Sequence, residues 1–147
     1  MVKIARFVYD GDEILSKTSF DANGGILFDN GWLLIDTHSQ DCCENVYANW
    51  DYIKDEAGLM DTDFSDLRIE EVARRRSVGI RLCGQWSFFV PCYNEQNGYY
   101  SDVLDIILFD TNQLVETEDS WMFGGTKRMA YKRLNEWHNV PVKDMYC

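Results

Sequence analysis

The residues best able to do chemistry gather in one short stretch that begins at Asp36. Asp36, His38, Asp41, Cys42 and Cys43 all carry side chains that can ligate a metal ion. Their spacing differs from that of the common zinc sites, and neighbouring side chains on a helix point about 100° apart. We therefore expect neither a metal nor a cofactor here.

A cysteine nucleophile with a histidine base is the other chemistry that these residue types allow. Cys42 or Cys43 would need His38 or His138 as the base, and no local motif joins them. The five cysteines are an odd number and include the adjacent pair. That pattern predicts reduced thiols rather than a disulfide framework. We expect a protein that is not an enzyme.

Acidic residues dominate the chain between Asp36 and Asp66. Nine acidic residues stand there against Lys54 alone, a formal charge of −8 in a chain of net charge −11. Such a field attracts basic partners and repels nucleic acid, although a merely solubilising surface is the ordinary alternative. The residues predicted to bind a partner are Asp51, Asp55, Glu56, Asp61, Asp63 and Asp66, with Trp50 and Tyr52 as exposed aromatic anchors.

Length and composition indicate how many domains the chain forms and whether it spans a membrane. A chain of 147 residues with 46% hydrophobic residues can bury one core, so we expect a single domain over residues 1–147. No apolar run approaches the roughly 18 residues that a membrane span needs. We expect a cytoplasmic protein.

Hairpin signals predict most of the secondary structure. Two β-rich runs meet at Asn30-Gly31, which favours a type I′ turn, and two more meet at Gly84-Gln85. The segment that ends at Phe109 is apolar on both faces. The sequence therefore predicts an α+β fold with an antiparallel sheet of about six strands.

Two helices are expected to pack on that sheet. Asp41 and Glu44 form a capping box, and Val46, Trp50 and Ile53 follow at helical spacing up to Gly58. The second helix begins after Gly124-Gly125 and ends before Pro141. Its apolar stripe is Ala130, Leu134 and Trp137.

Two motifs carry a resemblance to a known family. Gln40-Asp41-Cys42-Cys43-Glu44 and Asn97-Gly98-Tyr99-Tyr100-Ser101 together resemble a family of small, uncharacterised phage and bacterial proteins, a domain of unknown function. The likeness covers roughly residues 24–110 and implies a phage or mobile-element context. A pocket between the motifs would be lined by Asp41, Glu44, Glu95, Tyr99 and Ser101.

Together these observations predict a phage-encoded, acidic binding protein in the cytoplasm of a bacterial host. It would inhibit a nucleic-acid-handling defence complex, such as a CRISPR effector, by occupying a basic groove without touching nucleic acid itself. The alternative is a small nucleotide- or ligand-binding protein or enzyme that uses the pocket between the motifs. A homo-oligomeric accessory protein is a third possibility.

Overall fold

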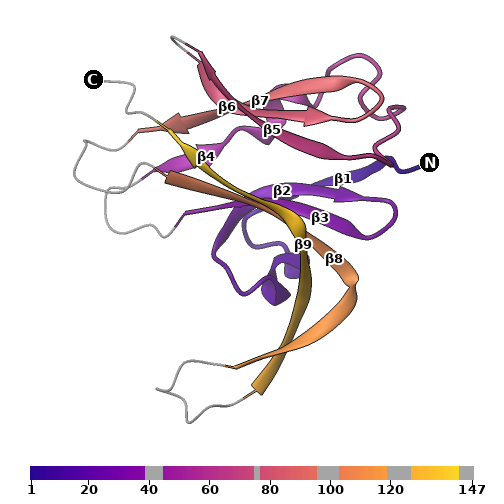
Figure 1. The fold of residues 1–147 in the computed structure, drawn as a ribbon, viewed down its shortest axis with the longest axis vertical. Helices are drawn as coiled ribbons and strands as arrows, with labels where there is room; N and C mark the ends of the chain where they lie inside the picture. The colour runs from indigo at the N-terminus through magenta and orange to yellow at the C-terminus, as the bar shows by residue number, and fades with distance from the viewer. Residues whose placement is uncertain (39–44, 75–76, 96–102, 119–126, 143–147) are drawn as a thin grey trace.

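The computed structural model is a sandwich of two antiparallel sheets (Figure 1). It describes residues 1–38, 45–74, 77–95, 103–118 and 127–142. The larger sheet has the strand order β1 (Ile4–Tyr9), β2 (Ala22–Phe28), β3 (Trp32–Thr37), β8 (Val103–Glu118) and β9 (Lys127–Pro141). The smaller has the order β4 (Val46–Ala48), β7 (Ser87–Asn94), β6 (Ser77–Cys83) and β5 (Arg68–Arg74).

The main core lies between the two sheets. Alternate residues of each strand enter it, as β8 shows with Leu104, Ile106 and Leu108. Ile107 and Phe109 point the other way, into a second cluster that η1 (Glu13–Lys17) helps to cover through Leu15. The prediction that β8 is buried on both faces is confirmed, but a short 3-10 turn covers the outer face in place of a helix.

The predicted α+β class is wrong. Among the described residues the only helical elements are the 3-10 turns η1 and η2 (Trp50–Ile53), of five and four residues. The same residues form nine strands rather than about six. The described residues contain no helix that is long and apolar enough to cross a membrane.

The first predicted helix is replaced by β4, η2 and turns. Val46, Ala48 and Trp50 are all buried while Tyr47 and Asn49 are partly exposed, which is the two-residue period of a strand. Val46 and Trp50 satisfy the helical spacing as well, so the apolar pattern did not separate the two structures. The capping-box residues Asp41 and Glu44 lie outside the described residues.

The second predicted helix is β9, the edge strand of the larger sheet. It pairs with β8 along most of its length, with Ala130 opposite Val115 and Val140 opposite Leu104. β3 pairs with one edge of β8. Pairing with β9 satisfies the backbone donors and acceptors along the other edge. Trp137 is 47% exposed, so the stripe read from the sequence is not a buried face.

Beyond the sandwich, β8 and β9 continue as a two-stranded ribbon (Figure 1). An irregularity between Asp110 and Leu114 marks where the ribbon leaves the sheet. There Thr111 N donates to Gly31 O at 2.9 Å, and Asn112 Nδ2 donates to Asn30 O at 2.8 Å. The ribbon is therefore fastened to the β2–β3 turn.

The β2–β3 hairpin is confirmed, but its turn type differs from the prediction. Gly31 N donates to Phe28 O at 3.1 Å, and Gly31 has a φ of 95°. Asn30 does not have the positive φ that a type I′ turn needs at its first central residue. The connection is a type I turn followed by a left-handed glycine.

Candidate partner-binding surface

The predicted partner-binding residues lie on the acidic loop, the connection of residues 49–67 between β4 and β5. Ile53, Leu59 and Phe64 anchor it in the main core. Phe64 N donates to Val2 O at 2.7 Å, and Gln85 N donates to the carbonyl of Asp63 at 2.8 Å. Three buried side chains and two backbone bonds hold the loop in one arrangement, so its outward side chains are positioned before any partner arrives.

Five of the six carboxylates are exposed and one is structural. Asp63 Oδ1 accepts from Val2 N and from the amide and hydroxyl of Ser65. These bonds, that of the Ser65 hydroxyl first, lower the pKa of Asp63 to about 2. The exposed carboxylates that face solvent are Asp51, Asp55, Glu56, Asp61 and Asp66.

Little positive charge neutralises the acidic loop. Six carboxylates and Lys54 give residues 49–67 a formal charge of −5. Among the described residues, none of the six forms an ion pair within 4 Å. Arg68, at the end of the loop, pairs with Glu70. The basic C-terminal segment is strand β9 of the other sheet.

The chain has one run of three consecutive arginines, at residues 74–76, and it begins at the end of β5. Arg74 ends β5, whose first residue, Arg68, is the one next to the acidic loop. Seven residues of strand span roughly 20 Å, so Arg74 lies far from the loop along that strand. Arg75 and Arg76 lie outside the described residues.

The two predicted aromatic anchors differ in exposure. Tyr52 is 57% exposed and its ring edge meets Phe89. Trp50 is only 5% exposed, so its prediction as an exposed anchor is wrong. Its ring belongs to the main core because Nε1 donates to Asp36 Oδ1 at 2.8 Å, turning the side chain inward.

Asp36, counted among the acidic residues, is fully buried between the sheets. Besides Trp50, Ala48 N donates to its Oδ2 at 2.8 Å and Asn23 Nδ2 at 3.2 Å. Burial raises the pKa of Asp36 to about 6, against the lowering effect of these bonds. Asp36 joins β2, β3, β4 and η2 and adds nothing to the acidic surface.

A pocket of 360 Å³ opens beside the acidic loop, where β1 and β2 meet β4 and η2. The rings of Tyr9, Tyr47 and Trp50 line it together with amide side chains and Asp51. We call it the aromatic pocket. Sequence reasoning missed it because residues 46–53 were assigned to a helix, which separates Tyr47 from Tyr9.

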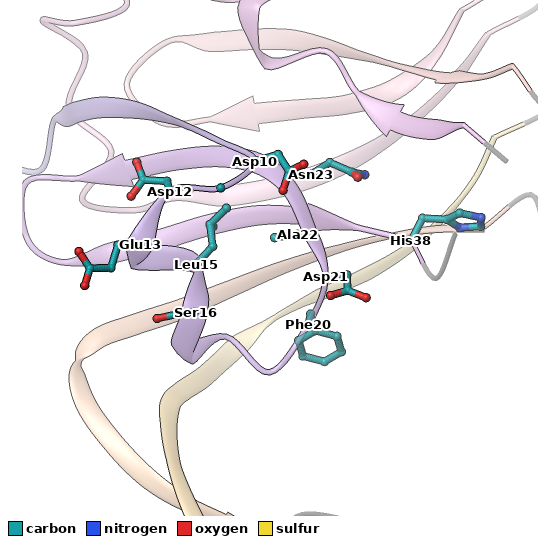
Figure 2. A pocket seen from close by; sticks show the side chains of 11 residues that line it. Asp10, Asp12, Glu13, Leu15, Ser16, Phe20, Asp21, Ala22, Asn23 and His38 are labelled. Atoms are coloured by element: carbon teal, nitrogen blue, oxygen red, sulfur yellow. The ribbon is translucent and has the colours of Figure 1, made fainter. Parts of the chain in front are cut away.

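A second pocket, of 480 Å³, lies under η1 (Figure 2). Asp10, Glu13, Asp21 and His38 line it, with Glu13 and His38 at opposite ends. His38 Nδ1 lies 2.9 Å from Val103 O. Within the described part of the chain, no three His, Cys, Asp or Glu residues are grouped so as to hold a metal ion.

The predicted pocket between the two motifs falls mostly outside the described residues, namely at Asp41, Glu44, Tyr99 and Ser101. The ends of both motif segments are nevertheless paired. His38 contacts Val103, and Glu95 N donates to Asn45 O at 2.9 Å. Glu95 also accepts from Asn45 Nδ2 at 2.7 Å and Tyr47 OH at 3.1 Å. The pocket stays a prediction.

The described cysteines are buried. Cys83 and Cys92 are both free thiols. Burial raises the pKa of the Cys92 thiol well above its usual value, which keeps it protonated and a poor nucleophile. Cys42, Cys43 and Cys147 lie outside the described residues.

Fold and surface define an antiparallel β-sandwich that carries a rigid acidic loop. No protein-family model, no curated protein and no solved structure matches the chain. The resemblance to the family of small phage and bacterial proteins therefore stays a prediction.

Proposed function

We propose that the protein is a non-enzymatic binding protein whose acidic loop docks on a basic surface of another protein. The observation that carries this proposal is the set of five exposed carboxylates on one rigid connection, without an ion pair among the described residues. Unneutralised carboxylates raise the local negative potential and speed the approach of a positive partner.

The partner of this proposal is a protein that itself binds nucleic acid. A groove that holds a phosphate backbone is lined by Lys and Arg and complements a string of carboxylates. The phage context of the motifs makes the finer proposal an inhibitor of a bacterial defence complex, such as a CRISPR effector, inside the host cytoplasm. It would exclude the nucleic acid by occupying its groove.

The test uses charge reversal and affinity capture from bacterial lysate. One variant carries Asp55→Lys, Glu56→Lys and Asp61→Lys in the acidic loop. Its matched control carries Asp10→Lys, Glu13→Lys and Asp21→Lys. These substitutions change the net charge by the same amount, at the pocket under η1. We expect the loop variant to lose the captured partner and the control to keep it.

The captured partner is then studied by association kinetics at several salt concentrations. Its association rate with the wild type should fall steeply as salt rises, and the loop variant should associate at least tenfold more slowly with a flatter dependence. Duplex DNA or RNA should compete for the partner. Equal binding by wild type and loop variant would reject the acidic loop as the interface.

A second candidate is a small ligand-binding protein or enzyme that uses the two motifs. The paired ends of the segments, His38 with Val103 and Asn45 with Glu95, favour it. A nucleotide that binds there should raise the melting temperature of the wild type. The nucleotide should not raise the melting temperature of the Glu95→Gln variant. Without nucleotide, the variant should melt at the same temperature as the wild type.

A further inference from the structure

We infer that the aromatic pocket takes a single cationic side chain, an arginine or lysine of the basic partner. This inference rests on the proposed function and names the contact by which the acidic loop would be anchored. Binding energy in protein interfaces concentrates where one side chain fills a pocket, rather than in exposed charge pairs.

The pocket adjoins the acidic loop and is built from both sheets. Tyr9 comes from β1 and Tyr47 from β4, while Asn49, Trp50 and Asp51 belong to the acidic loop itself. Its volume of 360 Å³ is at the small end of the range for ligand pockets, so it suits one long side chain rather than an extended ligand.

The lining selects positive charge. Among its described lining residues there is no Lys, Arg or His, and the one ionisable acid is Asp51. An anion such as phosphate would therefore meet no cation among the lining residues themselves. Aromatic faces attract cations, and Asp51 at the rim adds a full negative charge.

A cation already lies at this rim. Lys54 Nζ is 5.9 Å from the centre of the Tyr9 ring and 3.4 Å from its hydroxyl. Tyr9 OH donates to Asp51 Oδ1 at 2.8 Å, which fixes the ring and the carboxylate together. The Lys54 ammonium thus donates to the Tyr9 hydroxyl, which in turn donates to Asp51.

The floor of the pocket is held before any ligand enters. Asn23, Ala48 and Trp50 line the pocket, and each donates a hydrogen bond to the buried Asp36. Because these bonds fix the side chains of Asn23 and Trp50 and the backbone at Ala48, these residues have little conformational entropy left to lose on binding.

The experiment measures peptide binding by calorimetry at low salt. The probe is a hexa-arginine peptide with both ends blocked, and its neutral counterpart is the matching hexa-citrulline peptide. We expect the arginine peptide to bind the wild type at least tenfold more tightly. Amide shifts in NMR spectra should include those of Ala48, Asn49 and Asp51.

Variants of two exposed aromatic residues locate the contact. Tyr9→Leu removes a ring from the pocket, and Tyr9 is 48% exposed, so the fold tolerates the change. Binding should weaken three- to tenfold, whereas Tyr9→Phe should retain most of the affinity because the ring stays. The matched control Trp86→Leu removes an exposed ring from the turn between β6 and β7, outside the pocket, and should bind like the wild type.

The outcomes separate this inference from the proposed function. A further variant, Asp55→Asn with Glu56→Gln and Asp61→Asn, reduces the formal charge of the acidic loop from −5 to −2 and leaves the pocket intact. If it weakens peptide binding while Tyr9→Leu does not, the pocket is rejected and the acidic surface stands. If only Tyr9→Leu weakens binding, the pocket stands and the acidic loop fails. Equal binding of the citrulline peptide, or of a neutral saccharide in its place, overturns the cation assignment.

Discussion

Asp36 is a fully buried carboxylic acid within the sandwich. Its carboxylate lies at the meeting point of four elements and accepts hydrogen bonds from Asn23, Ala48 and Trp50. Burial disfavours the charged form, and three donors favour it. The pKa near 6 shows that burial has the larger effect.

The stability of the protein should therefore depend on pH through Asp36. An unfolded Asp titrates near pH 4, so between about pH 4 and pH 6 the folded state binds more protons than the unfolded state. The contribution of Asp36 to the free energy of unfolding must then fall as pH rises through that window. Between pH 5 and pH 7 the loss should be about 1 kcal/mol.

Urea unfolding of the wild type and of Asp36→Asn at pH 5 and pH 7 measures this effect. The variant lacks the titrating group, so the wild type should lose about 1 kcal/mol relative to it on going from pH 5 to pH 7. Asp63, with its lowered pKa, titrates below this window and affects both proteins alike. Parallel pH profiles would contradict a buried, titrating Asp36.

For single residues, the sequence shows which acidic residues lie between Asp36 and Asp66, but it does not show that Asp36 is the buried one. The identity of Asp36 as an inter-sheet contact depends on donors from β2, β4 and η2, which only the folded topology brings together. Trp50 was misplaced for the same reason. No local pattern shows that its indole N–H has a buried acceptor.

Among the elements, the β2–β3 turn stabilises two parts of the larger sheet. It closes the hairpin, and it fastens the β8–β9 ribbon through Thr111 and Asn112. Gly31 has a φ of 95°, and a Cβ there would collide with the side-chain amide of Asn112. The backbone conformation therefore favours glycine, and any larger residue would also displace the Asn112 side chain.

Gly31→Ala should lower the free energy of unfolding by about 1 to 2 kcal/mol for the left-handed backbone, and further for the collision. The double variant with Asn112→Ala separates the two causes, because it removes the colliding amide and leaves the backbone strain. A double-mutant cycle from urea unfolding should give a coupling energy of at least about 0.5 kcal/mol. Strict additivity would show that Asn112 does not meet position 31.

Hairpins were predictable at the scale of elements, and helices were not. Asn30-Gly31 and Gly84 are local turn signals, and the hairpins they predicted are present. The two expected helices rested on apolar spacing of three and four residues. In β9 the pairing with β8 overrides that spacing, and in the segment of β4 and η2 the residues Val46 and Trp50 fit both periods.

For the whole molecule, charge is the dominant property. The net charge is −11, and the acidic loop contributes −5 of it from a fixed position. Carboxylates without ion pairs repel one another in the folded state more than in the expanded unfolded chain. The acidic surface that we propose for binding should therefore reduce stability, as functional surfaces often do.

Removing three of the negative charges of the acidic loop should stabilise the fold at low salt. The variant Asp55→Asn, Glu56→Gln, Asp61→Asn is expected to gain about 0.5 to 1 kcal/mol in free energy of unfolding at 0.01 M salt, where the screening length is about 30 Å. The gain should shrink by more than half at 0.5 M salt, since screening then removes most of the repulsion. Urea unfolding at both salt concentrations measures it. The control Glu70→Gln removes a carboxylate that pairs with Arg68 and Arg81, so it should be neutral or slightly destabilising. A triple variant no more stable than the wild type at low salt would mean that cations already balance the acidic loop.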